Sequence, residues 1–230
     1  YGSKASKNPN SHSAHTLEQL GISSVTNDTA AVLDTALILY AEHEFNASTF
    51  AARTAASTLT DFHSAVTAAI ATLRGPLHGG ANEAALDLIL SFDDPEAAEV
   101  GVMRMLEERK LIMGFGHRVY RGGDPRSPII EACADRLAAT SDEKILAIAR
   151  SIEAVMRREK GLFPNLDFYS AVVFHQLRIK KDLFTPVFVI ARLAGWAAHI
   201  IEQLGDNRLI RPTSEYIGPE DRPFVPVVDR

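Results

Sequence analysis

The sequence contains a single cysteine, Cys133, so no disulfide can form within the chain. Such cysteine usage is typical of proteins in a reducing compartment, and we expect a cytoplasmic location. There is no secretory signal and no uninterrupted apolar run long enough to cross a bilayer. The closest approach, residues 187–201, is broken by Arg192 and His199. These absences predict a soluble protein that has no membrane partner.

The chain also lacks an excess of basic residues. It has 24 Lys and Arg against 29 Asp and Glu, a formal net charge of −5 over 230 residues. General nucleic-acid binders usually carry a net basic face, so we expect no nucleic-acid partner. Alternating strand patterns, internal repeats and low-complexity tracts are missing as well. The length is ample for a large core, and the sequence predicts an all-α protein.

The stretch that combines the most chemistry is residues 114–126, GFGHRVYRGGDPR. It contains one histidine, three arginines, one aspartate, four glycines and a proline. So many helix breakers predict a loop, and glycine lets the backbone approach a ligand closely. Arginine forks suit carboxylates and phosphates, and histidine can transfer a proton near neutral pH. The loop predicts a site for acid–base chemistry on a small polyanion; a solvated basic turn is the alternative.

Apolar periodicity predicts helices over most of the chain. The last of them is nearly apolar, begins with Thr185 as N-cap and Pro186, and ends at Gly205. The other expected helices cover residues 29–40, 81–92, 94–109 and 129–139. Residues 47–73 are expected to form helices that pack tightly against one another, and a further helix is expected to be capped by Ser141 and Asp142 and to end at Gly161. Residues 1–28 are expected to be an irregular lead-in, and residues 211–230, with four prolines, to wrap over a surface.

Several histidines have simple interpretations. His43 is followed by a glutamate, as in zinc-protease helices, but that motif needs a second histidine four residues on, where Ala47 stands. We therefore expect no metal site. His63 lies in an Ala- and Thr-rich segment and is expected to be a core or boundary histidine, whereas His12 and His15 lie in a polar stretch and should be solvated.

Three other residues are candidates for function. His78 lies between a proline and two glycines before an expected helix N-terminus, where the helix dipole favours a neutral imidazole or a nearby anion. Asp167 lies between Leu and Phe, where lost hydration would raise its pKa and make it a useful base; a helix cap is the alternative. Arg192 lies within an apolar helix and requires an anion or an internal ion pair.

Four blocks of the sequence, in this order and spacing, resemble the signature blocks of the citrate synthase family. They are LHGGANE at 77–83, GFGHRVY at 114–120, DPR at 124–126 and PNLD at 164–167. The resemblance implies a multihelical fold with a large and a small domain. It also implies condensation of an acyl-CoA with oxaloacetate to give citrate or a homologue, without a metal. No cofactor would be permanently bound, and the coenzyme A thioester would be a co-substrate.

The resemblance further implies catalytic and substrate-binding roles. Asp167 would remove the α-proton of the acyl group while His78 donates a hydrogen bond to the thioester oxygen. His117 would polarise and protonate the oxaloacetate carbonyl. The residues implied to hold the oxaloacetate carboxylates are His43, Arg126 and Arg192.

The same resemblance implies where coenzyme A would bind and how a partner subunit would contribute to the site. Arg121 would meet a CoA phosphate, and the backbone from Leu111 to Gly114 would lie near the adenine. Arg211 would reach into the site of a partner subunit, so a homodimer is expected. Family members carry a long N-terminal portion before the residue that matches Tyr1, which this sequence does not include. The expected domains are a large domain in residues 1–83, a small domain in 84–176 and a return to the large domain in 177–230.

Two blocks, YAEHEFN at 40–46 and GPEDRP at 218–223, resemble bacterial 2-methylcitrate synthases in particular. We therefore expect propionyl-CoA to be at least competitive with acetyl-CoA as a substrate. One alternative is a citryl-CoA lyase-type domain, which the intact DPR block at 124–126 disfavours. Another is an inactive binding protein of the same fold, which would show decay of the polar site; the sequence shows none.

Overall fold

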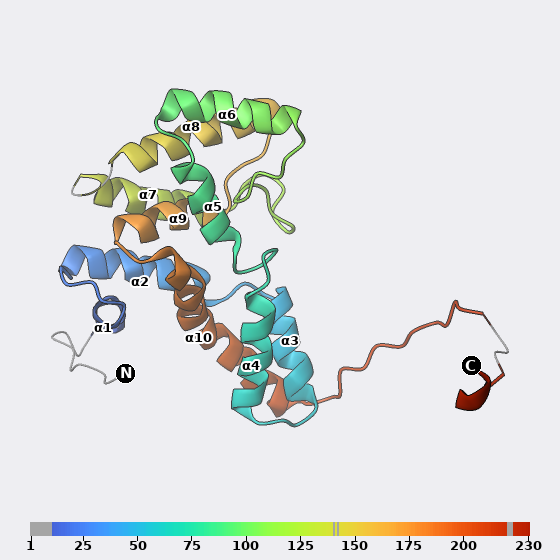
Figure 1. Cartoon of the computed structure of the whole chain (residues 1–230). Coiled ribbons are helices and arrows are strands. Elements are labelled where there is room, and N and C mark those ends of the chain that lie inside the picture. Colours follow the sequence, from blue (N-terminus) through green and yellow to red (C-terminus); the bar gives the residue numbers. More distant parts are fainter. Residues whose placement is uncertain (1–10, 140, 142, 220–222) are drawn as a thin grey trace.

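The computed structural model describes residues 11–139, 141, 143–219 and 223–230 (Figure 1). All regular elements of these residues are helices, and the one β-bridge found among them is isolated, between Phe115 and Pro164. The all-α prediction is therefore confirmed. The helices are α1 His12–Gln19, α2 Asn27–Ala41, α3 Ala47–Ser57, α4 Phe62–Leu73, α5 Ala81–Leu90, α6 Pro95–Glu107, α7 Ser127–Ala138, α8 Glu143–Lys160, α9 Leu166–Gln176 and α10 Phe184–Gly205, with short 3-10 helices η1 Lys181–Leu183 and η2 Val227–Asp229.

Side-chain caps fix where several helices begin. Thr26 and Thr29 form a reciprocal capping box at the start of α2. Asp94 accepts a hydrogen bond from the backbone N–H of Ala97 at 2.7 Å, and Pro95 follows as the first residue of α6. These local signals explain why both helices begin within two residues of their predicted starts.

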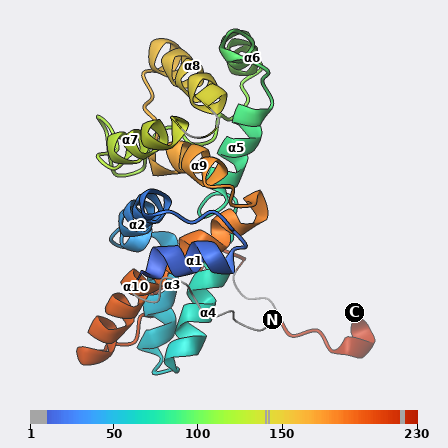
Figure 2. The ribbon, with the colours of Figure 1, turned by 90° about the vertical axis from the view of Figure 1, so that its left-hand side faces the viewer.

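The helices form two groups that meet in the middle of the molecule. In one group α10 packs on α2, α3 and α4, and α1 lies against α2. In the other group α6 packs on α8, while α9 lies against α5 and α7 (Figures 1 and 2). The chain passes between the groups through residues 74–80 and again through residues 177–183.

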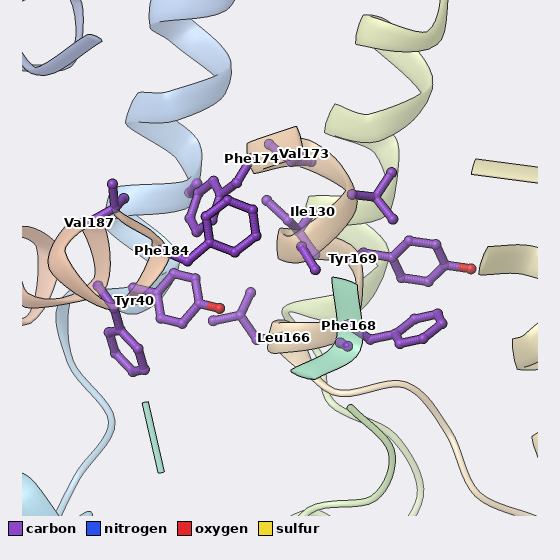
Figure 3. Packing of buried hydrophobic residues seen from close by; sticks show 14 of the residues in the cluster. Tyr40, Ile130, Leu166, Phe168, Tyr169, Val173, Phe174, Phe184 and Val187 are labelled. Atoms are coloured by element: carbon purple, nitrogen blue, oxygen red, sulfur yellow. The ribbon is translucent and has the colours of Figure 1, made fainter. Parts of the chain in front are cut away.

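The core is richest in aromatic side chains around α9. Nine of the residues of α9 are buried, so this helix is covered on all sides. Figure 3 shows Phe168, Tyr169 and Phe174 of α9 among Tyr40 of α2 and Phe184 of α10, which are also buried. The first turn of α9 is thus held rigidly, and it carries one of the predicted functional residues.

The helix α10 begins differently from the prediction. It starts at Phe184, and Thr185 is not its N-cap. The Thr185 hydroxyl instead donates to Glu83 Oε1 of α5 at 2.6 Å, which ties the two groups of helices together. Residues 181–205 are long and apolar enough to cross a membrane by length and composition alone, but α10 packs against α2, α3 and α4 and buries Arg192, as a core helix does.

Two predictions about the first third of the chain are wrong. The described part of the lead-in, residues 11–28, is not irregular, because it contains helix α1, which Ser11 caps and whose Leu17 side chain is buried in the core cluster. The exposed side chain of His12 agrees with its prediction, and His15 is half-buried. His63 is no core residue: its side chain is 95% exposed beside Asp61, because α4 turns this face to solvent.

The C-terminal tail also departs from the prediction. Residues 211–219 and 223–230 are almost fully exposed and extend away from the helices of their own chain (Figure 1). Within the described part of the chain the tail does not wrap over a surface, because its apolar side chains remain exposed, as Ile217 does at 94% exposure. The predicted helix cap at Ser141 and Asp142 includes a residue outside those described.

Candidate active site

A cavity of about 710 Å³ lies where the two groups of helices meet. It is lined by residues that follow α2, precede α5, precede α7, begin α9 and lie within α10. The predicted catalytic and oxaloacetate-binding residues brought together in its wall are His43, His78, His117, Arg126, Asp167 and Arg192. Leu111 and Gly114 line it too, whereas Arg121 and Arg211 are exposed outside it.

The loop after α6 is fixed against the start of α9 by its backbone. Gly116 N–H donates to the Phe163 carbonyl at 2.8 Å, and Asn165 N–H donates to the Gly114 carbonyl at 2.9 Å. Gly114 has a φ of +88°, and a Cβ there would lie 2.9 Å from the ring of Phe168. Only glycine therefore suits this position, and the loop that carries His117 is pinned beside the helix that carries Asp167.

A buried ion pair strengthens the same junction. Asp124 is 3% exposed and accepts hydrogen bonds from Arg126 Nη2 at 2.8 Å and Nε at 3.0 Å. It also accepts the Leu166 N–H at 3.1 Å, at the start of α9. Burial alone would raise the pKa of Asp124, but the hydrogen bonds and charge of Arg126 outweigh burial and lower it. Asp124 thus orients Arg126 and the first turn of α9 together.

Asp167 is not the cap of α9, because Asn165 takes that position and accepts the Asp167 N–H at 3.1 Å. The helix-cap interpretation of Asp167 is therefore wrong. Its carboxylate lines the cavity, and Oδ1 accepts a hydrogen bond from the Tyr40 hydroxyl at 2.6 Å. Burial raises the pKa of Asp167, against the opposing effects of the Tyr40 hydrogen bond and the charges of Arg126 and Arg192. A carboxylate so placed is a stronger base than one in water.

His43 and His117 face each other, with their Nε2 atoms 3.1 Å apart. The Nδ1 atom of His117 accepts the backbone N–H groups of Val119 at 3.0 Å and Tyr120 at 3.3 Å, so this nitrogen is unprotonated. Neutral His117 therefore carries its proton on Nε2 and donates it toward His43. Burial, followed by the charge of Arg126, lowers the pKa of His43 to about 4, and burial also lowers the pKa of His117.

His78 is held by a serine on α3. Its Nε2 atom lies 2.8 Å from the Ser48 hydroxyl and accepts the Ser48 backbone N–H at 3.4 Å. Because Nε2 accepts this N–H, the ring proton of the neutral imidazole is on Nδ1, and this donor has no partner among the described residues. Trp196 Nε1 donates to the same hydroxyl at 3.2 Å and fixes it. Burial, with a smaller effect of the Arg192 charge, lowers the pKa of His78 to about 4.

Arg192 is 2% exposed and carries an incomplete set of hydrogen bonds. Its Nε donates to the Tyr40 carbonyl at 2.6 Å, and its guanidinium lies 4.9 Å from the centre of the Phe188 ring. Among the described residues it forms no ion pair, and its Nη1 atom is buried without a partner. Burial, then the charge of Arg126, lowers its pKa to about 10. The alternative prediction of an internal ion pair for Arg192 is therefore wrong. A buried donor without a partner is suited to bind an anion.

Reasoning from the sequence missed several residues of the site. Tyr40 was indistinguishable from a core residue, because it falls on the apolar stripe of its helix. Ser48 carries no local signal, since its partner is thirty positions away in sequence. No group of three or more His, Cys, Asp or Glu side chains that could hold a metal is found in the described residues.

The sequence matches the family model "Citrate synthase, C-terminal domain" over residues 2–213. It is 50% identical to a 2-methylcitrate synthase of Shewanella oneidensis over 200 residues, which are 86% of this chain and 53% of that protein. It is also 50% identical to citrate synthase 2 of Bacillus subtilis, over 85% of this chain and 53% of that protein.

A solved structure shares the fold at comparable coverage. The citrate synthase of Thermoplasma acidophilum, in a ternary complex with carboxymethyl coenzyme A and oxaloacetate, superposes with a TM-score of 0.88 at 38% identity. The match covers 96% of this chain and 60% of that one. The chain thus spans about half the length of the curated relatives it matches. From the family match and these identities, the chain belongs to the citrate synthase family.

Proposed function

We propose that this chain carries the active-site half of an enzyme that condenses an acyl-CoA with oxaloacetate, giving citrate or 2-methylcitrate and free CoA. The observation that carries the proposal is the composition of one cavity wall. A desolvated carboxylate, neutral histidines and two arginines converge there. Each group supplies one requirement of the reaction.

Oxaloacetate would occupy the side of the cavity with the positive charge. Arg126 and Arg192 would bind its carboxylates, and the unpaired Nη1 of Arg192 would gain an acceptor. His43 would add a third contact by turning from His117 to the substrate. The Nε2–H of His117 would then be free to polarise the ketone carbonyl.

The acyl group would lie between Asp167 and His78. Asp167 would take the α-proton, so that the C–H bond breaks, an O–H bond forms and the electron pair moves toward the thioester oxygen. The Nδ1–H of His78 would stabilise that oxygen by a hydrogen bond. The enol carbon would then attack the ketone carbon while His117 donates its proton to the new alkoxide. Water would finally cleave the thioester and release CoA.

The coenzyme A part of the substrate would extend along the loop after α6. Leu111 and Gly114 line the cavity and could lie near the adenine. Arg121 is exposed outside the cavity, where a phosphate could reach it. CoA would act as a co-substrate and would not be permanently bound.

A homodimer in the cytoplasm is part of the proposal. The exposed tail carries apolar side chains, among them Ile217 and Phe224, which would be covered by a second subunit. Arg211 lies in this tail, is not part of the lining of the cavity of its own chain, and would enter the partner's site. The 2-methylcitrate synthase and the citrate synthase named above are each 50% identical to this chain. These identities therefore do not distinguish propionyl-CoA from acetyl-CoA as the preferred substrate.

Release of CoA thiol tests the proposal. Thiol should appear from acetyl-CoA and from propionyl-CoA only when oxaloacetate is also present. We expect both substrates to react, because one methylene changes specificity by only ~1–3 kcal/mol. Binding without thiol release would show a binding protein instead, and activity only with citryl-CoA would show a lyase. A kcat/KM that favours acetyl-CoA a thousandfold, far more than about 200-fold for one methylene, would refute a competitive role for propionyl-CoA.

A further inference from the structure

Tyr40 is a buried residue that reaches both sides of the cavity. It lies in the last turn of α2, and its side chain is 2% exposed. Its ring centre lies 4.2 Å from that of Phe188 and 6.2 Å from that of Phe174. The ring is therefore fixed by packing, and the position of the hydroxyl does not depend on the hydrogen bond that it makes.

The polar atoms of Tyr40 contact two proposed functional residues. Its hydroxyl donates to Asp167 Oδ1 at 2.6 Å, and its carbonyl accepts Arg192 Nε at 2.6 Å. Figure 3 shows the hydroxyl oxygen directed toward Leu166 at the start of α9. Among the described residues, no side chain other than Tyr40 donates a hydrogen bond to the Asp167 carboxylate. The Oδ2 atom therefore remains available to a substrate.

We propose that Tyr40 is a positioning residue for Asp167, whose hydroxyl holds Oδ1 so that Oδ2 is presented to the α-carbon of the acyl group. This proposal rests on the proposed function, because the proton accepted by Oδ2 is the α-proton of the condensation. The proton leaves carbon, bonds to Oδ2, and its electron pair moves toward the thioester oxygen. Tyr40 keeps its own proton, since burial and the charge of Asp167 raise its pKa well above 10.

The electrostatics agree with this role. Burial raises the pKa of Asp167, and the hydrogen bond from Tyr40 on α2 is the leading influence that lowers it. The other charged groups that act on it are Arg126 and Asp124 from the loop before α7 and Arg192 from α10. Loss of the hydroxyl would remove a hydrogen bond to a carboxylate, so both its orientation and its pKa should change.

The test is Tyr40→Phe, which keeps the ring and removes only the hydroxyl. Its matched control is Tyr169→Phe, because Tyr169 is also buried and donates to a carboxylate, that of Glu153 on α8, away from the cavity. Both variants are made in the protein expressed from its complete gene. Measurements are kcat, the KM for oxaloacetate, thermal stability, and the pKa of Asp167 from carbon-13 resonances of labelled aspartates, assigned with Asp167→Asn.

For Tyr40→Phe we expect kcat to fall at least about tenfold, since misplacement by 1 Å can cost about 100-fold. The KM for oxaloacetate should change less than about threefold, and the pKa of Asp167 should rise by about one unit. Tyr169→Phe should alter neither kcat nor this pKa. An unshifted pKa, a kcat within twofold of the wild type, or an equal loss in Tyr169→Phe would each overturn the proposal.

The outcome separates this proposal from the proposed function. If the wild-type protein releases no thiol from any acyl-CoA with oxaloacetate, the proposed function fails. The resonance of Asp167 still reports whether the Tyr40 hydroxyl controls that carboxylate. If the wild type is active and Tyr40→Phe is unchanged, the function stands and the positioning role is refuted.

Discussion

Neutral imidazoles beside a desolvated carboxylate define the chemistry of individual residues in this cavity. The pKa values of His43 and His78 are lowered to about 4, chiefly by burial, while burial raises the pKa of Asp167. Near pH 7 the histidines can therefore donate hydrogen bonds without a net charge, and the carboxylate is poorly solvated. Such a site should cost folding stability, because burial disfavours the ionised form of Asp167 and because Arg192 Nη1 is buried without a partner among the described residues.

Asp167→Asn should stabilise the fold at neutral pH. A carboxyl whose folded pKa is raised binds its proton more tightly than in the unfolded chain, so its ionisation destabilises the fold above the unfolded pKa. The substitution removes this cost and should raise Tm at pH 7, by roughly 2–4 °C for each kcal/mol regained. The gain should disappear as the pH falls below about 4, where the unfolded carboxyl is protonated too. Thermal unfolding at several pH values measures the effect; a gain independent of pH would contradict it.

Arg192→Leu should weaken oxaloacetate binding and also stabilise the fold. Loss of a charged hydrogen bond to a carboxylate, about 1.5–3 kcal/mol, should raise the KM for oxaloacetate roughly 10- to 100-fold. Because the guanidinium is buried and forms no ion pair with any described residue, an apolar side chain should increase Tm. The KM for the acyl-CoA, measured in the same assay, is the internal control. An unchanged KM for oxaloacetate would show that Arg192 does not bind this substrate.

At the scale of elements, α10 positions the end of α2 by close contact. Gly195 lies against the main chain there, and a Cβ at this glycine would lie 2.2 Å from the Ala41 carbonyl oxygen. Tyr40 precedes this point and His43 follows it. The close approach of the two helices therefore sets the positions of two residues of the cavity.

Gly195→Ala should disturb both stability and turnover. Overpacking against a backbone oxygen should cost about 1–3 kcal/mol, and displacement of α2 should lower kcat. Gly205→Ala is the matched control, since Gly205 ends the same helix and a Cβ there would meet nothing within 4 Å. The control should be neutral or slightly stabilising. Equal Tm values for the two variants in thermal unfolding would refute the packing argument.

Helices were predictable from sequence where local signals dominate. Periodicity placed the starts of α2 and α6 within two residues, because both starts are fixed locally, by a Thr capping box in α2 and an Asp-Pro start in α6. The start of α10 was not predictable, since the Thr185 hydroxyl bonds to Glu83, 102 positions away. The same limit applies to the site. His78, His117 and Asp167 stand out by their neighbours in sequence, whereas the Tyr40 hydrogen bond joins residues 127 positions apart.

At the scale of the whole molecule, the predicted domain boundaries remain predictions. The boundary after residue 83 falls inside α5, which begins at Ala81, so a crossing in residues 74–80 agrees better with the helices. The second subunit of the proposed homodimer would cover the exposed tail, whose apolar side chains are uncovered by the described residues of one chain. The location of Arg211 in this tail makes the proposed sharing of sites testable.

Mixing two inactive variants should restore activity if sites are shared. Homodimers of Asp167→Asn or of Arg211→Ala should be poorly active at both sites. Because such an interface has twofold symmetry, a heterodimer would have one site that contains both substitutions and one site that contains neither. With random pairing about half of the dimers are mixed, so roughly a quarter of all sites should recover. Mixed dimers without recovery would show that Arg211 acts in its own subunit or not at all.

The central claim is that Asp167 removes the α-proton in a condensation of acyl-CoA with oxaloacetate. Its most direct test is the rate of oxaloacetate-dependent thiol release by wild type and Asp167→Asn at saturating substrate. The wild type should turn over, and the variant should lose most of kcat, about 100-fold or more, while the KM for oxaloacetate stays nearly unchanged. A variant that retains near-normal turnover would contradict the account.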